Sequence, residues 1–587
     1  MYSVVKTSSL ALCFIGFIFV STRAEFFTAI SDVEPLLETH IKIIEDLEEY
    51  IEKEEKRISV LKRHLKVYQT EHEKAMEDIP NYLGNPINAF TLIKRLTTDL
   101  EFIEKKIEIG TEYETREYIK NISIISDDDY IQYPSLEDLT GAAQALTRLQ
   151  ETYHLDVNDL AEGILNGVIY RDESTPVSDD QSITIFTSMN SDDCYELGKV
   201  LYNEKDYKNA LAWMQLALKK YPNDDELYNF TDVDILEYIS FCYYLLGDLR
   251  NALNWTKKLL MLDPSHDRAK GNIPHYRDAL FKKQSDLSKK NRGVSPGKKQ
   301  DTGQPTVDAN EEAEKPKELT KYEKERKVYE ALCRGEMEIP RAISKRLTCR
   351  YLTENHPFLR LAPIKMEYVY LNPDIVVFHE VLNDDEIFEI MMMARPRFRR
   401  ATVHDPKTGE LVPAHYRISK SAWLKDEESP IIENLSRRIA DFTGLSMVSA
   451  EELQVVNYGI GGHYEPHFDF ARKQESAFEN FNGNRIATVL FYMSDVAQGG
   501  ATVFTELGLS VFPQRGAAVF WLNLHPSGEG DLATRHAACP VLRGSKWVCN
   551  KWIHQGGQEL IKPCDLEYQS EGIIRPLPRP LVKKTFR

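Results

Sequence analysis

The first pattern of apolar and polar positions is a heptad repeat between residues 34 and 70. Apolar residues stand at intervals of seven on one seam and recur on the adjoining seam: Leu37, Ile44, Ile51, Ile58 and Leu65, then Leu47, Leu61 and Tyr68. Such spacing predicts a coiled coil, which Glu54 makes imperfect because it interrupts the second seam. A second helical run is expected over residues 90–107. We expect these two helical runs to form a dimerisation element, and the alternative is an intramolecular helical hairpin.

Residues 193–222 follow a different period, typical of a tetratricopeptide repeat. Small or apolar residues occupy the positions where two helices must pack closely: Leu197, Gly198, Leu201, Ala210, Met214, Ala217 and Pro222. A weaker second copy carries Ile239, Tyr243, Ala252, Leu259 and Pro264, and the connection NDDELYNFTD is an insertion between the two. Because two such units rarely stand alone, flanking helices are expected to cap them.

Three tyrosines, Tyr202, Tyr238 and Tyr244, fall on the expected concave face of this helical unit. Exposed aromatic rings stack well on extended, proline-rich peptides. The pattern therefore predicts a peptide groove, with ordinary packing between helices as the alternative.

The composition of the chain changes at residue 285. Residues 285–321 are charged, contain Gly and Pro and lack apolar periodicity, which predicts a flexible linker. Short β-rich runs follow, separated by Gly-rich and polar turns: YVYLNPDIVVF, LQVVNY, RIATVLFYMSD, ATVF, AAVFWL and KWVCNKWIH. This spacing predicts an all-β barrel or sandwich after an all-α N-terminal half.

Length and charge limit the functional classes. A chain of 587 residues is too long for one core and predicts about two to four domains. The formal net charge of -18 argues against a nucleic-acid partner. The expected division is a leader, a helical N-terminal domain, a tetratricopeptide-like domain, a linker and a catalytic domain, at residues 1–24, 25–187, 188–284, 285–321 and 322–587.

Residues 1–24 have the composition of a secretory signal peptide. Lys6 provides a short positive region, the stretch from Leu10 to Val20 is apolar, and small residues precede the expected mature start at Glu25. An uncleaved anchor is the alternative. No later segment has about 18 uninterrupted apolar residues, so the mature chain is expected to lack a membrane span. The C-terminal LVKKTFR is not a retention signal of the KDEL type.

Entry into the secretory pathway permits disulfides and glycans. Of eight cysteines, Cys13 leaves with the leader, and two local pairs are plausible among the other seven: Cys333 with Cys349 and Cys539 with Cys564. Cys194, Cys242 and Cys549 remain, so at least one free thiol is expected. The glycosylation candidates are Asn121, Asn229 and Asn434, while the sequon at Asn254 falls within a predicted helix.

The segment YGIGGHYEPHFD and the later TRHAACP carry the strongest chemical signal. His467 and Asp469 are two residues apart, so on a strand both would face one cavity, and His536 from a distant strand would complete the set. Two imidazoles and one carboxylate on one side of a metal are the facial triad of non-heme Fe(II) oxygenases. Three positions then stay open, two for a chelating 2-oxo acid and one for O2. His463 is expected to point elsewhere.

Lys546 is a candidate anchor for the distal carboxylate of the 2-oxo acid, because a buried carboxylate needs a counter-charge. Tyr458 could donate a hydrogen bond to the same carboxylate. His554 would face the same way as Lys546 on an extended segment and could contact the chelating end. Trp552 could form a wall of the pocket. For each residue, an ordinary place in the barrel core or at a strand edge is the alternative.

Several long strings resemble the animal collagen prolyl 4-hydroxylase α subunits. They are LQVVNYGIGGHYEPHFDFAR, GNRIATVLFYMSDVAQGGATVF, GEGDLATRHAACPVL and GSKWVCNKWIH, with RRATVHDPKTG, YRISKSAWL, EDLTGAAQALTRLQETY and DCYELGKVLY upstream. Nearly the whole mature chain is involved. The resemblance implies a double-stranded β-helix that binds Fe(II) through His467, Asp469 and His536. It further implies that Lys546 holds the distal carboxylate of 2-oxoglutarate and that His554 assists its binding and decarboxylation.

The same resemblance extends to the substrate, the partners and the disulfides. It implies 4-hydroxylation of proline in X-Pro-Gly sequences of procollagen in the endoplasmic reticulum lumen, with ascorbate rescuing oxidised iron. It implies an α2β2 tetramer with protein disulfide isomerase as the β subunit. It carries over a peptide-binding set, Tyr202, Tyr238, Tyr244, Arg268 and Asn272. The two disulfides implied are Cys333–Cys349 and Cys539–Cys564.

Three positions depart from the family pattern. Phe241 stands where a groove tyrosine is usual, His463 where a glutamine is usual, and Cys549 where a serine is usual. The lost phenol bears on the preferred peptide, so hydroxylation of another secreted proline-rich protein is an alternative. A catalytically silent reader of proline-rich chains and a zinc hydrolase built on the same three ligands are further alternatives, although neither explains Lys546.

Overall fold

The computed structural model describes most of the chain in two units. The described residues are 55–108, 136–165, 188–223, 228–292, 319–404, 411–413, 416–472, 483–565 and 579–580. One unit comprises Met1–Glu73 with Glu101–Ile125, and the other comprises Lys74–Leu100 with Ser126–Arg587. The predicted leader, the heptad positions up to Ile51 and the sequon at Asn121 lie outside the described residues.

The helix over residues 55–77 contains the described part of the heptad pattern. Ile58 and Leu65, on the main seam, are 42% and 58% exposed. The ring of His64 contacts that of Phe102 at 5.6 Å, so the N-terminal unit makes an intramolecular helix contact away from the seam. Dimerisation through the exposed seam stays a prediction.

The helical run expected over residues 90–107 is confirmed, but two helices rather than one occupy this segment. α4 (Pro86–Arg95) and α5 (Thr98–Glu108) are separated by a turn. The hydroxyl of Thr97 donates to the carbonyl of Ile93 at 2.8 Å, and such a side-chain bond competes with continuation of the helix. The apolar period alone does not reveal this interruption.

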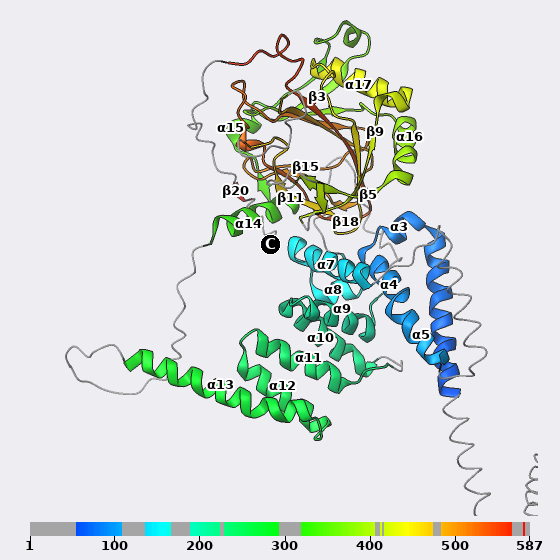
Figure 1. Cartoon of the computed structure of the whole chain (residues 1–587), viewed down its shortest axis with the longest axis vertical. Coiled ribbons are helices and arrows are strands. Elements are labelled where there is room, and N and C mark those ends of the chain that lie inside the picture. The colour runs from blue at the N-terminus through cyan, green and yellow to red at the C-terminus, as the bar shows by residue number, and fades with distance from the viewer. Residues whose placement is uncertain are drawn as a thin grey trace, which may run out of the picture. The chain divides into compact units, whose positions relative to one another are not determined.

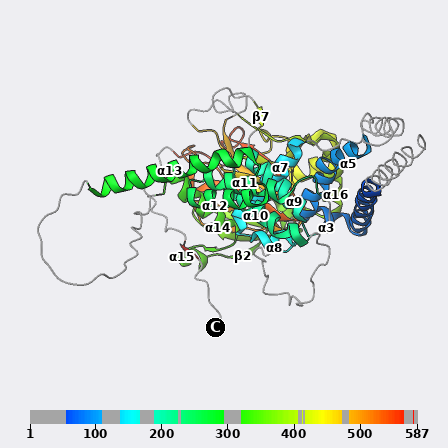
Figure 2. The ribbon, with the colours of Figure 1, turned by 90° about the horizontal axis from the view of Figure 1, so that it is seen from below.

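The tetratricopeptide-like region consists of helices that pack in sequence order, as Figures 1 and 2 show. They are α9 (Ser191–Asn203), α10 (Tyr207–Lys220), α11 (Asp232–Leu245), α12 (Leu249–Leu262) and α13 (Asp267–Arg292). A Cβ on Gly198 would lie 3.0 Å from Cγ of Met214, so glycine permits the close approach of α9 to α10. The repeat prediction is confirmed, and α7 (Leu136–Tyr153) packs against α9 as an expected flanking helix.

The boundary of the predicted linker differs from the structure. α13 continues to Arg292, into the segment expected to be a flexible linker. The sequence offers no glycine or proline between Lys282 and Arg292, and the first breaker is Gly293. Charged composition alone therefore does not end this helix. α14 (Lys321–Cys333) begins at the expected end of the linker.

The C-terminal region is built on two antiparallel sheets. The larger has the order β2-β3-β4-β16-β12-β19-β10-β9-β5, and the smaller has the order β15-β14-β17-β11-β8. The strands of the larger sheet are β2 (Cys349–Leu352), β3 (Ile364–Tyr370), β4 (Ile375–His379), β16 (Ala518–Leu522), β12 (Arg485–Tyr492), β19 (Lys546–His554), β10 (Leu453–Tyr458), β9 (Lys420–Leu424) and β5 (Arg399–Arg400). The strands of the smaller sheet are β15 (Leu509–Val511), β14 (Thr502–Phe504), β17 (His536–Ala538), β11 (His463–His467) and β8 (Arg417–Ile418). Every predicted β-rich run contains a strand.

Two apolar cores lie on the two faces of the larger sheet. One fills the space between the sheets and contains Tyr492 and Trp521 from the larger sheet and Phe504 from the smaller. The other packs the outer face against two helices, α16 (Asp384–Ala394) and α17 (Pro430–Thr443), which lie along that face in Figure 1. Two facing antiparallel sheets agree with the expected jelly-roll class. No helix in the described ranges is long and apolar enough to cross a membrane.

The expected disulfide pairing is wrong in this structure. Cys333, the last residue of α14, is bonded to Cys539, which follows β17. Cys349 and Cys564 are free and exposed. Closeness in sequence suggested the local pairs, but α14 packs on β14 and β15, which brings its end beside the end of β17. The three remaining thiols, those of Cys194, Cys242 and Cys549, are buried and form no disulfide.

Candidate metal and cosubstrate site

The candidate metal ligands come from the smaller sheet. β11 ends at His467, β17 begins at His536, and these two residues are register partners in the antiparallel pair. Asp469 lies in a bend beyond the end of β11, so the expectation that both His467 and Asp469 are strand residues is wrong. The bend nevertheless brings the carboxylate of Asp469 close to the imidazole rings of His467 and His536.

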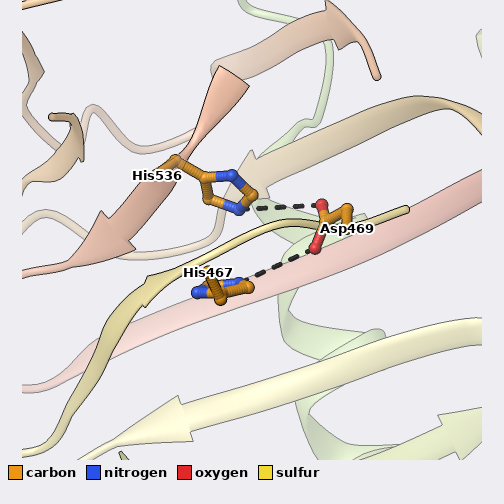
Figure 3. A group of neighbouring side chains, drawn as sticks. All are labelled: His467, Asp469 and His536. Atoms are coloured by element: carbon orange, nitrogen blue, oxygen red, sulfur yellow. Dashed lines mark ion pairs between the residues drawn. The ribbon is translucent and has the colours of Figure 1, made fainter. Parts of the chain in front are cut away.

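The three side chains converge in a geometry that suits a metal ion (Figure 3). Their ligand atoms lie within 4.8 Å of one another, and the described part of the chain contains no other such group. Nε2 of His467 and Nε2 of His536 are each 3.7 Å from a different oxygen of Asp469. Nδ1 of His467 donates to the carbonyl of Glu465 at 2.8 Å, and Nδ1 of His536 donates to that of Thr534 at 2.9 Å. These bonds leave both Nε2 atoms free to bind a metal.

The electrostatics of the cluster keep Asp469 and His467 in their metal-binding forms. Although burial raises the pKa of the Asp469 carboxyl, His536, His467 and Arg485 lower it more, to about 2. Burial and the neighbouring His536 hold the pKa of His467 well below its ordinary value. A carboxylate beside neutral imidazole is the state in which these groups bind a cation.

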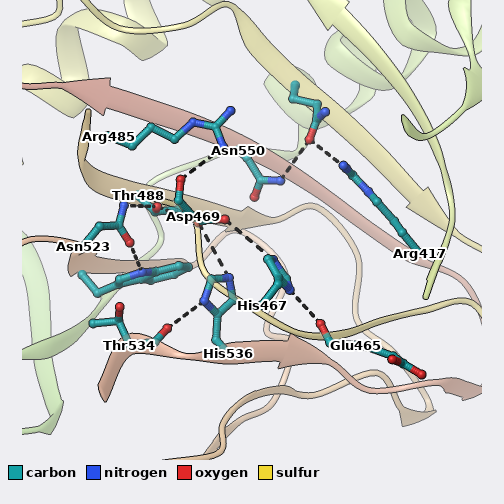
Figure 4. Close-up of polar contacts among 12 residues, drawn as sticks. Arg417, Glu465, His467, Asp469, Arg485, Thr488, Asn523, Thr534, His536 and Asn550 are labelled. Atoms are coloured by element: carbon teal, nitrogen blue, oxygen red, sulfur yellow. Dashed lines mark hydrogen bonds and ion pairs between the residues drawn. The ribbon is translucent and has the colours of Figure 1, made fainter. Parts of the chain in front are cut away.

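A chain of buried hydrogen bonds fixes the carboxylate, and sequence reasoning missed it (Figure 4). The hydroxyl of Thr488 donates to Oδ2 of Asp469 at 2.8 Å and accepts from Nδ2 of Asn523 at 2.9 Å. Nε1 of Trp521 donates to Oδ1 of Asn523 at 2.8 Å. An isolated threonine within the apolar run RIATVLF was the available signal, because a buried hydroxyl needs a partner.

Lys546 is the buried cation of the same cavity. It opens β19 opposite Tyr458, lines the cavity with the three ligands and is 1% exposed. Its Nζ donates to the hydroxyl of Thr502 at 3.4 Å and lies 5.5 Å from the centre of the Tyr458 ring. Burial lowers the pKa of Lys546 to about 7. No carboxylate among the described residues forms an ion pair with the ammonium group of Lys546, so this group is suited to bind an acidic ligand.

The remaining predicted residues of this region differ in position. Tyr458 and Trp552 line the cavity with Lys546, as expected. His554 does not line it, since its Nδ1 bonds the carbonyl of Gly483 at 2.7 Å and its Nε2 lies 2.8 Å from Glu451. Glu451 also pairs with Arg485, whose guanidinium lies 3.9 Å from the centre of the Trp552 ring. His554 is therefore connected to the cavity wall through Glu451 and Arg485.

The predicted peptide groove contains most of its expected residues. A cavity of about 620 Å³ in the tetratricopeptide-like region is lined by Tyr202, Tyr238, Arg268 and Asn272. Phe241, which the sequence analysis placed at a groove position, also lines it. The lining residues that sequence reasoning did not include are Tyr195, Asp234, Glu237 and Gly271. Tyr244 is not among them, because its ring stacks on Tyr276 at 4.9 Å and its hydroxyl bonds His275 at 3.0 Å.

Three family models match separate parts of the chain. Residues 29–167 match the prolyl 4-hydroxylase alpha-subunit, N-terminal region; residues 191–282 match the prolyl 4-hydroxylase peptide-substrate-binding domain; and residues 453–554 match the 2OG-Fe(II) oxygenase superfamily. The last match contains His467, Asp469, His536 and Lys546. It identifies Fe(II) as the metal of the domain, with 2-oxoglutarate and O2 as cosubstrates.

The chain is similar to curated proteins over nearly its whole length. Prolyl 4-hydroxylase subunit alpha-2 of Caenorhabditis elegans is 45% identical over 93% of this chain and 94% of that protein. Subunit alpha-1 of Gallus gallus is 43% identical over 93% and 99%. The solved structure of a viral collagen prolyl hydroxylase from Paramecium Bursaria Chlorella virus-1 is 22% identical and covers 30% of this chain and 94% of that one, with a TM-score of 0.26. The chain belongs to the prolyl 4-hydroxylase alpha-subunit family, and its C-terminal domain is that of a 2-oxoglutarate- and Fe(II)-dependent oxygenase.

Proposed function

We propose that this chain is the catalytic alpha subunit of a procollagen-proline 4-dioxygenase that hydroxylates proline in X-Pro-Gly repeats to 4-hydroxyproline. The observation that carries the proposal is the cavity that joins the three ligand side chains to a buried lysine. A metal site alone would fit several enzyme classes, but the lysine requires an anionic partner beside the metal. Of the reactions considered, 2-oxoglutarate-dependent hydroxylation explains both features.

His467, Asp469 and His536 would hold the iron through two imidazole nitrogens and a carboxylate. When bound, iron with O2 and 2-oxoglutarate supplies the oxidation that converts the C4–H bond of proline to C4–OH, with release of succinate and CO2. Lys546 binds the distal carboxylate of 2-oxoglutarate, and Tyr458 opposite it is positioned to donate a hydrogen bond. Trp552 closes one wall and excludes water.

His554 acts as a positioning residue in this proposal. Its Nε2 lies 2.8 Å from Glu451, whose carboxylate pairs with both Nε and Nη2 of Arg485. Nη1 of Arg485 donates to the backbone carbonyl of Asp469 at 3.4 Å. Loss of His554 would therefore loosen a chain of contacts that ends at a metal ligand and at Trp552, and so lower cosubstrate binding and decarboxylation.

The aromatic cavity of the helical domain binds the proline-rich chain. Tyr202, Tyr238 and Phe241 offer ring faces, and Arg268 and Asn272 offer hydrogen-bond donors to peptide carbonyls. Tyr244 contributes indirectly, since its ring contacts that of Phe241 at 5.5 Å. We propose that the peptide domain comprises residues 188–284 and the catalytic domain residues 322–587.

A partner subunit and a location complete the proposal. The relatives are named as alpha subunits, which supports an assembly with a β subunit. We infer that this subunit is protein disulfide isomerase in an α2β2 tetramer within the endoplasmic reticulum lumen. Ascorbate would return oxidised iron to Fe(II). Asn229 and Asn434 are exposed and remain glycosylation candidates.

The test is turnover of a (Pro-Pro-Gly)n peptide by the chain co-expressed with protein disulfide isomerase. Fe(II), 2-oxoglutarate and ascorbate are supplied, and succinate and 4-hydroxyproline are both quantified. Equal amounts of the two products, absent in a Lys546→Ala variant, support the proposal. Succinate without hydroxyproline would show an oxygenase with another substrate and would contradict it. A peptide competition series then asks whether a non-collagen proline-rich sequence is preferred.

A further inference from the structure

A second cavity lies beside the strand that carries His467, and the function proposed above does not use it. Its volume of about 290 Å³ is near the lower end for small-ligand sites. Its walls come from α7, the end of α9, α14 and β11. It has no lining residue in common with the metal cavity or with the aromatic groove.

The wall of this cavity is acidic. Six carboxylates and three arginines line it: Glu151, Glu204, Asp206, Glu325, Glu330 and Glu465, with Arg148, Arg326 and Arg535. Two arginines are already paired with wall carboxylates, Arg535 with Glu325 and Arg326 with both Glu330 and Glu151. The remaining negative balance favours a positively charged guest.

Two residues of β11 indicate that a guest is needed. His463 lines the cavity and is 4% exposed, and its Nδ1 has no hydrogen-bond partner among the described residues. Burial and the nearby Arg148 lower the pKa of His463 to about 3, so the ring is neutral and one nitrogen accepts hydrogen bonds. Within the described ranges the Glu465 carboxylate makes no ion pair, although Arg148 lies near it. Both groups call for a donor.

The arrangement favours an organic cation over a metal ion. Among the described residues only His467, Asp469 and His536 bring donor atoms close enough together for a metal, so the carboxylates of this cavity are too far apart. Tyr322 and Tyr329 line the same space. Guanidinium is planar, stacks on aromatic rings and carries five N–H donors, which suits separated acceptors beside phenol rings.

We propose that this cavity binds the guanidinium group of an arginine residue in the polypeptide substrate, with the Glu465 carboxylate as its ion-pair partner and His463 as a second acceptor. The source of the arginine follows from the two elements that border the cavity. α9 presents Tyr202 to the aromatic groove, and its capping residue Glu204 lines this cavity. β11 presents His467 to the metal cavity and Glu465 to this cavity. A polypeptide held at both sites is therefore placed beside it. This step rests on the proposed function.

The expected effect is on substrate binding rather than on the chemical step. The guanidinium would lie outside the metal cavity, so it would bind equally in the ground state and the transition state. Such uniform binding lowers KM and leaves kcat unchanged. The expected KM difference for such an ion pair is about tenfold, which corresponds to about 1.4 kcal/mol.

The test compares peptides that differ only in charge. In a (Pro-Pro-Gly)n peptide one residue is replaced by arginine or by citrulline, its uncharged analogue, at a series of distances from the reacting repeat. KM and kcat are measured for the wild-type complex, for Glu465→Gln and for a control, Glu433→Gln, whose side chain is 60% exposed on α17. We expect the arginine peptide to have an about tenfold lower KM at one or a few placements in the wild type and the control. In Glu465→Gln the two peptides should differ less than twofold.

The contrary results are distinct. Equal KM values at every placement overturn the proposal, and so does an arginine preference that survives in Glu465→Gln. Ethylguanidinium is added in a further arm. The site is supported if ethylguanidinium abolishes the preference for the arginine peptide and leaves the KM of the citrulline peptide unchanged. If ethylguanidinium binds but neither peptide is preferred, the substrate does not supply the guanidinium group, and the proposal is overturned.

Failure of the proposed function would be recognised separately, because no peptide would then be hydroxylated. In that case direct binding of a labelled, proline-free arginine peptide to the wild type and to Glu465→Gln tests the cavity alone. Binding lost in Glu465→Gln supports the site, and absence of binding to the wild type overturns it.

Discussion

Replacing Lys546 with methionine is expected to stabilise the cofactor-free protein while removing 2-oxoglutarate binding. Lys546 is 1% exposed, and its described hydrogen bond is the contact with Thr502 at 3.4 Å. Burial is the cause that lowers its pKa from 10.5 to about 7, which means that the fold disfavours the charged amine. Methionine has a similar volume and no charge, so it fills the same space without this cost.

The magnitude follows from the shift in pKa. One pKa unit corresponds to 1.36 kcal/mol, so a change from 10.5 to about 7 corresponds to about 5 kcal/mol in order of magnitude. Between these pH values the unfolded chain binds more protons than the folded chain, so the stability of the wild type rises with pH. Below about pH 7 the full penalty is present. The advantage of Lys546→Met is therefore largest at neutral and acidic pH and declines towards pH 10.5.

The assay is thermal unfolding of the intact complex without cosubstrate at pH 6.5 and 9.5, with KM for 2-oxoglutarate measured in parallel. Lys551→Met is the matched control, because Lys551 is buried in the same strand but pairs with Asp426 at 2.9 Å. Lys551→Met leaves Asp426 without this lysine and should lower the free energy of unfolding by about 1–3 kcal/mol. We expect Lys546→Met to melt at a higher temperature, by more at pH 6.5. A lower melting temperature at both pH values, or a gain independent of pH, would refute the reasoning.

Further predictions concern the metal, the cosubstrate and the peptide. Asp469→Ala should remove iron from the purified protein with an unchanged circular dichroism spectrum; retained stoichiometric iron would contradict the ligand assignment. Thr488→Val should raise the iron Kd by about 10–100-fold while kcat at saturating iron is largely kept, and an unchanged Kd would show that its bond to Asp469 is unimportant. Binding of 2-oxoglutarate at pH 8 should take up about one proton, seen by calorimetry in two buffers, because its carboxylate raises the pKa of Lys546 from about 7. Phe241→Tyr should lower KM for a proline-rich peptide about fivefold by adding one hydrogen bond, and equal KM values would count against that position as a determinant.

Several features could be predicted from the sequence because they depend on local rules. Alternation and β-branched content identify β10, β12 and β19, and the small residue at Gly198 identifies the close contact of α9 with α10. The metal ligands were found because two of them are separated by one residue and the third stands in a short, specific string. Lys546 was found because a carboxylate in an apolar barrel must meet a cation. Composition, period and spacing determine these features before any long-range contact forms.

The tertiary structure decided what depends on neighbours that are distant in sequence. It joined Cys333 to Cys539, because α14 packs on the smaller sheet. It placed His554 against Glu451 instead of in the cavity, although its position on β19 suggested otherwise. It also formed the acidic cavity from α7, α9, α14 and β11, four elements that share no sequence pattern. The physical reason is that the packing of separate elements decides which partners a side chain meets. The side chain's own segment determines only which element forms and which face of that element the side chain occupies.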